Sequence, residues 1–500
     1  MHITERTLLL NHPSETNAAN GLSLCFAIVC IVDVFGVFPI VTLPKAIIDC
    51  GYYGILLVII VCSSQIYTAI LLGKCWLIAE EIDPAMSNRN RYPYLALAQI
   101  TYGKCLSNIV TFLLDLTIFG GGIPNLIVAS RTLELLGLRI TDHNFDIPYC
   151  YWMIILGAAL CPILWLGSPK DMKCVCSLSV FMVISVFILV TGCLLFSTNS
   201  NRTATGTDQN LEDIIPKEIP LWKSMLTGYG IIAFQFDIHP TILTIQMDMN
   251  DKMKLPRAVI GAFAASLCMC GITTILSSIK YGTNTESSIL ETLPTTIPLE
   301  ITAGLTALQL YLTSVVSNNA LYQHLEDCLS ISRDFNPKRC ALRTILLILA
   351  VVIAQAVPSF DLVMSTIGGT LIGPLVFILP PLFYLKMLSL QTDHEQELTM
   401  ESLEPLTNIV YDKDTNSKSL QEYREHPFKK DINLSLKLAQ TNSKQLFNKY
   451  FVRGVCLLII IVYSIVTTVT TYLNFKSATL SYSNYTKPCI YNISTALLYL

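Results

Sequence analysis

The sequence predicts an all-α membrane protein that crosses the bilayer about eleven times. Only 14% of the 500 residues are charged, whereas soluble domains carry about 25%. The apolar residues are gathered into runs of membrane-spanning length, since roughly 20 of them in a helix cross the hydrocarbon core. The net charge of −3 argues against binding to nucleic acid.

The apolar runs divide the chain into five regions. We expect a cytosolic disordered N-terminus at 1–21, a ten-helix core at 22–386, a polar cytosolic insert at 387–450, an eleventh helix at 451–473 and an extracellular or lumenal tail at 474–500. The predicted spans are 22–43, 54–77, 106–130, 149–166, 174–197, 222–247, 257–279, 299–322, 343–358, 360–386 and 451–473. The insert is rich in charged residues, Asn and Ser, which favours a solvated linker over a folded regulatory module.

Lys and Arg residues set the predicted orientation, because they gather on the cytosolic side of membrane proteins. With the N-terminus inside, 24 of the 33 basic residues are cytosolic and nine are not. Leaving out the seven in 413–444 still gives 17 against nine. The N-terminus is therefore predicted to be cytosolic and the C-terminal tail extracellular or lumenal.

Glycosylation motifs agree with this orientation. Asn201, Asn484 and Asn492 each begin an Asn-x-Ser/Thr motif, and all three fall on the predicted outer side. Asn433 begins a fourth motif on the cytosolic side and is expected to carry no glycan. Three motifs on one side support the assignment and predict a glycoprotein.

The sequence shows no chemistry typical of an enzyme. The 17 cysteines are scattered, without metal-ligand spacing or a disulfide framework, and most are expected to be small core residues. The chain shows neither a nucleotide-binding loop nor a Ser/His/Asp cluster. We therefore predict a non-enzyme with no metal or cofactor.

Two of the predicted spans are interrupted in a similar way. The stretch 228–257 is apolar until Asp237, His239 and Pro240, and it becomes apolar again before a charged run. The first span carries Asp33 and Gly36, followed by two prolines. Proline cannot continue a regular helix, and a carboxylate at membrane depth costs about 2.5–3.5 kcal/mol on insertion scales. Such features are tolerated where the backbone lines a cavity enclosed by protein.

These interrupted spans are the first and the sixth, so they correspond if ten spans form two five-helix halves. Interrupted helices in corresponding positions indicate the binding site of an inverted-repeat transporter. A broken helix exposes N–H groups at one end and C=O groups at the other. The first kind of end favours a carboxylate and the second an ammonium group, so a zwitterionic amino acid fits the site.

Five stretches of the chain resemble the amino acid/auxin permease family, which includes vesicular GABA transporter-like and proton- or sodium-coupled neutral amino acid carriers. The most specific are Thr-Ile-Gln-x-Asp-Met at 244–249 and the Ile-Gly-Gly…Leu-Pro-Pro run within 365–385. The others are TLPKAIIDCGYYG (42–54), SQIYTAILLGKCW (64–76) and NALYQHLEDCLSISRDFNPKRCALR (319–343). The resemblance implies an eleven-helix fold with a five-plus-five inverted repeat and broken helices one and six.

The resemblance also implies a small-molecule amino acid substrate, neutral or zwitterionic, between helices one and six. The candidate substrate-binding residues are Asp33, Gly36, Val37, Phe234, Gln235 and Asp237. Similar carriers have two glycines where this chain has Val37 and Pro39. A non-transporting membrane sensor or scaffold with the same fold is therefore an alternative.

Three titratable residues lie in or beside the two interruptions, and they favour proton coupling. Asp33 and Asp237 would lie in a medium that disfavours the charged carboxylate, and His239 titrates near neutral pH. These three residues are the proton-coupling candidates, and a sodium-coupled symporter is the alternative. The expected membrane is the plasma membrane or a vesicular or lysosomal one. Of the remaining ionisable residues, His324 and Glu326 are interpreted as structural, and Asp115 has no predicted role.

Overall fold

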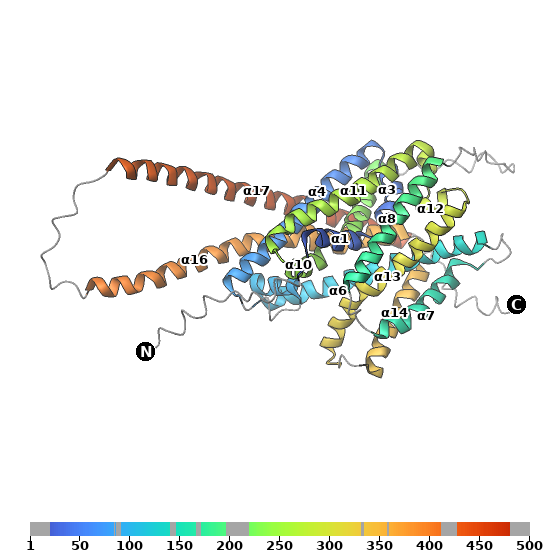
Figure 1. The fold of residues 1–500 in the computed structure, drawn as a ribbon, viewed down its shortest axis with the longest axis horizontal. Coiled ribbons are helices and arrows are strands. Elements are labelled where there is room, and N and C mark those ends of the chain that lie inside the picture. Colours follow the sequence, from blue (N-terminus) through green and yellow to red (C-terminus); the bar gives the residue numbers. More distant parts are fainter. Residues whose placement is uncertain are drawn as a thin grey trace.

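The computed structural model describes residues 21–84, 86, 92–140, 147–166, 172–196, 220–331, 335–357, 360–411 and 428–480. Within these ranges the regular structure is helical, and the one β contact is an isolated bridge between Leu22 and Met249. Figure 1 shows the helices gathered into a bundle, from which two long helices, α16 (Leu379–Tyr411) and α17 (Phe428–Leu480), extend at one end.

Eight helical stretches of the described residues are long and apolar enough to cross a membrane. They are Tyr52–Ile82, Pro93–Arg139, Cys176–Phe196, Lys252–Lys280, Ile297–Cys328, Pro337–Ala356, Phe360–Gln396 and Tyr450–Ser477. The chain is therefore an all-helical membrane protein with several spans. The three further predicted spans are also helical, but one is the short α7 (Tyr149–Leu166) and two are broken.

The long helices surround the broken ones. The long helices are α4 (Tyr52–Ile82), α6 (Pro93–Ile140), α8 (Met172–Phe196), α11 (Leu255–Lys280), α13 (Ile297–Cys328) and α14 (Pro337–Ala356). Of these, α6 is kinked at Gly103, where the backbone is not helical and φ is +83°. Packing between α13 and α6 and between α13 and α8 is extensive, while α4 packs on α16. The tenth predicted span comprises α15 (Phe360–Ile367), the wider π-helical η3 (Gly368–Ile378) and the start of α16. Pro374 lies within η3, where its missing N–H is consistent with the irregular hydrogen bonding.

Two glycines allow helix α9 (Leu221–Gln235) to lie directly against α15 and η3. A Cβ atom on Gly230 would collide with the carbonyl oxygen of Ser365, and one on Gly368 would collide with the carbonyl oxygen of Gly230. Both obstacles are backbone atoms, which cannot move aside as a flexible side chain can. The contact therefore depends on the absence of side chains at both positions.

We expect Gly230→Ala and Gly368→Ala to lower the stability of the folded protein. Overpacking typically costs about 1–3 kcal/mol, so the melting midpoint in detergent should fall clearly in each variant. Gly192 in α8 is the matched control, because a Cβ atom there meets no heavy atom within 4 Å. Gly192→Ala should be neutral or stabilising by up to about 1 kcal/mol. Equal melting midpoints for all three variants would contradict the close approach.

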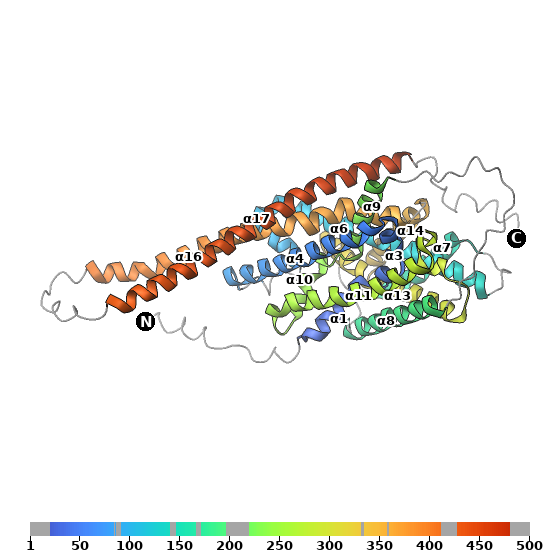
Figure 2. The same cartoon turned by 90° about the horizontal axis from the view of Figure 1, so that it is seen from above.

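The ends of the predicted insert 387–450 are helical. Helix α16 continues to Tyr411, and α17 begins at Phe428, whereas the sequence predicts a boundary at each end of the insert. Both extensions leave the bundle at the same end in Figures 1 and 2. Residues 412–427 lie outside the described residues. Whether the segment is a linker or a regulatory module stays a prediction.

One cysteine forms a disulfide, although the spacing of the cysteines in the sequence shows no disulfide framework. Cys150, at the start of α7, is disulfide-bonded. Fourteen cysteines with described side chains are free. The sequence could not reveal this bond, because pairing depends on which Cβ atoms the fold brings together. The predicted glycosylation residues Asn201, Asn484 and Asn492 lie outside the described residues.

Candidate functional site

The first broken helix is interrupted at Gly36. Helix α1 (Leu24–Phe35) ends there, a four-residue turn α2 (Phe38–Val41) follows, and α3 (Leu43–Asp49) completes the span. Gly36 has φ +61°, a conformation that glycine adopts without steric cost. Val37 is buried and precedes the first residue of α2. The carbonyl groups at the end of α1 thus face a bend rather than another helical turn.

The second broken helix is interrupted between Gln235 and His239. Helix α9 ends at Gln235, and α10 (His239–Asp248) begins after a gap of three residues, with Pro240 in its first turn. Asp237 lies in the gap, and its Oδ1 accepts a hydrogen bond from the backbone N–H of His239 at 3.1 Å. A carboxylate in this position satisfies one of the unpaired N–H groups and is favoured by the helix dipole.

The two interruptions lie against each other. Gln235 Nε2 donates to the Thr42 hydroxyl at 2.7 Å, which joins the end of α9 to the junction of α2 and α3. The rings of Phe35 and Phe236 pack edge to face with centroids 5.1 Å apart, and those of Phe38 and Phe234 do so at 6.2 Å. The structure therefore brings together the two segments that the sequence singled out.

Backbone hydrogen bonds also join the start of the first span to the end of the sixth. Leu22 N donates to Asp248 O at 2.7 Å, and Asn250 N donates to Leu22 O at 3.0 Å. Leu22, two residues before α1, is thus tied to Asp248 and Asn250 at the end of α10. Consequently the first span begins at the side where the sixth span ends.

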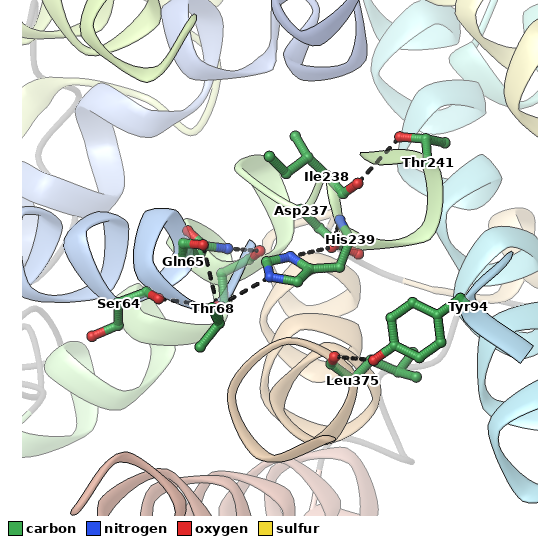
Figure 3. Close-up of polar contacts among 10 residues, drawn as sticks. Ser64, Gln65, Thr68, Tyr94, Asp237, Ile238, His239, Thr241 and Leu375 are labelled. Carbon is green, nitrogen blue, oxygen red and sulfur yellow. Dashed lines mark hydrogen bonds and ion pairs between the residues drawn. The ribbon is translucent and has the colours of Figure 1, made fainter. Parts of the chain in front are cut away.

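Helix α4 supports the second interruption from one side, as Figure 3 shows. Gln65 Nε2 donates to the carbonyl oxygen of Ala233 at 3.0 Å, in the last turn of α9. The hydroxyl Oγ1 of Thr68 lies 3.0 Å from Nε2 of His239. Helix α4 thus contacts both halves of the broken sixth helix.

Asp237 and His239 form a close pair inside the protein. The Nδ1 atom of His239 lies 3.6 Å from Oδ1 of Asp237, and the two side chains are 0% and 8% exposed. Nδ1 is buried and has no hydrogen-bond partner. The Tyr94 ring of α6 lies near the pair in Figure 3, and its hydroxyl donates to Leu375 O at 2.6 Å. The structure thus places two ionisable side chains inside the second interruption.

Asp33 occupies different surroundings from the other two proton-coupling candidates. Its carboxylate accepts a hydrogen bond from the Cys176 thiol of α8 at 3.2 Å. Nearby, Gly36 faces Gln309 of α13, whose Nε2 would lie 3.0 Å from a Cβ atom on that glycine. Gln309 Nε2 also donates to Ser179 of α8 at 3.3 Å. In the described part of the chain, the hydrogen bonds of Asp33 therefore run toward α8 rather than toward Asp237 or His239.

The predicted substrate-binding residues divide into two groups in the structure. Gly36, Val37, Phe234, Gln235 and Asp237 line the junction of the two interruptions. Asp33 lies two residues before the end of α1 and contacts α8. Direct contact of any of these residues with a substrate stays a prediction.

Four polar residues at the site were not identified from the sequence. Gln65 and Thr68 lie on α4, Ser179 on α8 and Gln309 on α13, and all four are buried. Their sequence signal was a polar side chain inside an apolar span. Packing alone explains many polar residues in apolar spans. Only their hydrogen bonds and positions in the structure distinguish these four from the others.

Other buried or partly buried ion pairs lie on different helices from the two interruptions. His324 Nδ1 of α13 lies 2.8 Å from Asp115 Oδ2 of α6. Glu326 accepts hydrogen bonds from Arg343 Nε at 2.6 Å and from Arg339 Nε at 3.2 Å. These pairs join α13 to α6 and to α14. In the residues that the structure describes, no group of three or more His, Cys, Asp or Glu side chains could hold a metal ion.

A helical membrane protein with two interrupted spans in contact has the architecture of a carrier with a central site. A family model described as "Transmembrane amino acid transporter protein" matches residues 24–411. The chain belongs to this family of transmembrane amino acid transporters, which confirms the resemblance seen in the sequence. It is accordingly a member of a transporter family and not of an enzyme family.

Curated relatives are similar along most of the chain. Amino acid transporter AVT1I of Arabidopsis thaliana is 23% identical over 369 residues, which cover 70% of this chain and 82% of that protein. The vesicular inhibitory amino acid transporter of Homo sapiens is 22% identical over 373 residues, which cover 69% of this chain and 66% of that protein.

Solved structures are similar at a coarser level. A crystal structure of MhsT in complex with L-phenylalanine has a TM-score of 0.45 and 12% identity, covering 75% of this chain and 98% of that one. A crystal structure of an Eremococcus coleocola manganese transporter has a TM-score of 0.44 and 13% identity, covering 92% and 99%.

Proposed function

We propose that the protein is a secondary active transporter of neutral or small zwitterionic amino acids, driven by a proton gradient. The observation that carries the proposal is the contact between the two interrupted spans, with the Asp237–His239 pair buried beside it. The interruptions offer carbonyl groups at the end of α1 and N–H groups at the start of α10. An amino acid presents an ammonium group and a carboxylate, which match these two ends.

The arrangement of the broken spans supports transport by alternating access. Because Leu22 is bonded to Asp248 and Asn250, the first span begins where the sixth span ends. This antiparallel relation is what a five-plus-five inverted repeat requires. In such carriers one group of helices rocks against the other around a fixed site. Eleven spans, ten of them in the repeat, are part of the same proposal.

The Asp237–His239 pair favours protons over sodium as the coupling ion. Sodium sites need carbonyl and hydroxyl oxygens but no group that titrates. A histidine and a carboxylate 3.6 Å apart are both groups that can bind a proton. Several relatives, the human protein among them, are named as vesicular transporters, which supports a vesicular membrane. The proposed membrane is vesicular, lysosomal or plasma membrane.

Uptake into liposomes tests the proposed function. Purified protein should accumulate at least one neutral amino acid against its gradient when a pH difference is imposed across the membrane. An equal sodium gradient at constant pH should give only equilibration. Accumulation driven by sodium alone would favour the sodium symporter. The absence of any uptake or exchange across a panel of amino acids would favour a sensor or scaffold.

The orientation has a separate test. Disulfides persist outside the cytosol, so the bond at Cys150 supports an outer location for the start of α7. Asn201, Asn484 and Asn492 should then carry glycans and Asn433 should not, measured as glycosidase-sensitive mobility in single Asn→Gln variants. Cys150 should react with a maleimide only after reduction. A glycan on Asn433 would reverse the orientation.

A further inference from the structure

Thr68 is the polar contact of the imidazole on the side away from Asp237. Its Oγ1 lies 3.0 Å from His239 Nε2, and the same oxygen lies 3.0 Å from Ser64 O and 3.2 Å from Gln65 O. Thr68 and His239 are both 0% exposed. Figure 3 shows the hydroxyl between its own helix and the ring. The hydroxyl therefore has two kinds of neighbour, carbonyl oxygens and a ring nitrogen.

A hydroxyl group can be a hydrogen-bond donor or an acceptor, since it has one hydrogen to donate and two lone pairs that accept. When Nε2 carries a hydrogen, Oγ1 can accept it and donate its own hydrogen to Ser64 O. When Nε2 is bare, the hydroxyl can rotate and donate to the ring. The carbonyl groups of Ser64 and Gln65 lie inside α4, where helical N–H groups also bond them. They therefore tolerate the loss of the Thr68 bond.

We infer that Thr68 is a positioning residue that lets the buried His239 both gain and lose a proton. The inference rests on the proposed function, because it describes how the transporter's proton is held. In the protonated state Nε2–H donates to Thr68, and Nδ1–H faces Asp237 Oδ1 at 3.6 Å. In the neutral state Thr68 donates to Nε2, and the remaining hydrogen stays on Nδ1. The exchangeable proton is thus the one on Nε2, and Thr68 is a hydrogen-bond partner of that nitrogen in both states.

The other titratable groups near the pair do not replace this role. Tyr94 of α6 lies close enough to Asp237 and to Cys75 of α4 for electrostatic interaction. Its hydroxyl already donates to Leu375 O at 2.6 Å. Asp33 is bonded to Cys176 on α8. Among the described contacts, Thr68 is the hydrogen-bond partner of Nε2.

The test replaces Thr68 by valine, which keeps the shape and removes the hydroxyl. Substrate exchange is measured as a function of pH in proteoliposomes, together with the 15N NMR titration of His239 in histidine-labelled protein. The chain has seven histidines, and the His239→Gln variant assigns the signal. Thr68→Val loses the bond in both states, and the bond to the charged imidazolium is the stronger of the two. Both midpoints should therefore move to lower pH by about one unit. Thr68→Ser should restore them.

Two further variants make the result specific. Thr101 of α6 is buried, and its hydroxyl bonds to Leu97 O and Ala98 O in its own helix. Thr68 makes the same kind of bonds in α4, so Thr101→Val is the matched control. This variant should leave both midpoints unchanged. Thr68→Cys keeps a weak donor and acceptor, so it should shift both midpoints by an intermediate amount. This variant replaces Thr68→Val in the test if the valine variant does not fold.

The outcomes separate this inference from the proposed function. Coincident titration curves for His239 in the wild type and Thr68→Val would overturn the role of Thr68, whatever the transport data show. Equal shifts in the valine and serine variants would also overturn it, because packing rather than the hydroxyl would be responsible. A shifted NMR titration in a protein that exchanges no amino acid would support the role of Thr68 and reject the proposed transport.

Discussion

Replacing Asp237 by asparagine should abolish the uphill accumulation of substrate while leaving substrate exchange intact. Asparagine cannot take up a proton, so a pH gradient can no longer be coupled to the substrate. Its side-chain oxygen can still accept the 3.1 Å bond from His239 N, because asparagine caps helices about as well as aspartate. The expected result is accumulation reduced to simple equilibration, measured in proteoliposomes with an imposed pH gradient. Counterflow of labelled substrate should persist.

Asp33→Asn is the matched variant, because Asp33 is the other candidate carboxylate of the broken spans. If it shares the coupled proton, accumulation should fail as in Asp237→Asn. Its bond to Cys176 of α8 places it apart from the Asp237–His239 pair, so the two variants separate the candidates. Accumulation that follows sodium, ignores pH and persists in both variants would contradict proton coupling.

Removing the charge of Glu326 should produce the largest loss of stability. Glu326 and Arg343 are each 1% exposed and lie 2.6 Å apart. Arg343 also donates to Leu164 O at 2.5 Å, and its guanidinium lies 5.4 Å from the centre of the Tyr322 ring. Breaking a buried pair on one side leaves an uncompensated charge and costs about 3–5 kcal/mol. Glu326→Leu should therefore lower the melting midpoint in detergent strongly.

A double variant distinguishes loss of the pair from loss of packing. Glu326→Leu combined with Arg343→Met removes both charges of this pair, while Arg339, the other partner of Glu326, stays in both variants that lack Glu326. The double variant should therefore be closer to the wild type than the sum of the single variants predicts. The exposed pair Lys254–Asp251, at 3.1 Å, is the control, and Lys254→Ala should leave the melting midpoint unchanged. Strictly additive effects in the double variant would show that the two side chains act separately.

The positions of the helix interruptions could be predicted from the sequence because their causes are local. Gly36 adopts a conformation that glycine favours, and Pro240 lies in the first turn of α10. Asp237 accepts a bond from a backbone N–H only two residues away. Each effect is decided within a few residues, so a single sequence contains the information.

The partners across the site could not be predicted, because they depend on how distant helices are placed. Thr68 is 171 positions from His239, and Asp33 is 143 positions from Cys176. A polar residue in an apolar span looks the same whether it contacts a site or only its own helix. The disulfide at Cys150 and the helical ends of the insert were missed for related reasons, since pairing and helix length depend on tertiary context.

The backbone bonds between Leu22 and the end of α10 have a consequence for mutational studies of this protein. Leu22 N, Leu22 O, Asp248 O and Asn250 N make these bonds, and no side chain takes part in them. A scan that replaces side chains would therefore pass over this junction and report it as dispensable. Only a change that removes an N–H group, such as Leu22→Pro or Asn250→Pro, would expose the constraint. Tolerance of substitution at these positions is therefore no measure of how firmly the two broken spans are joined.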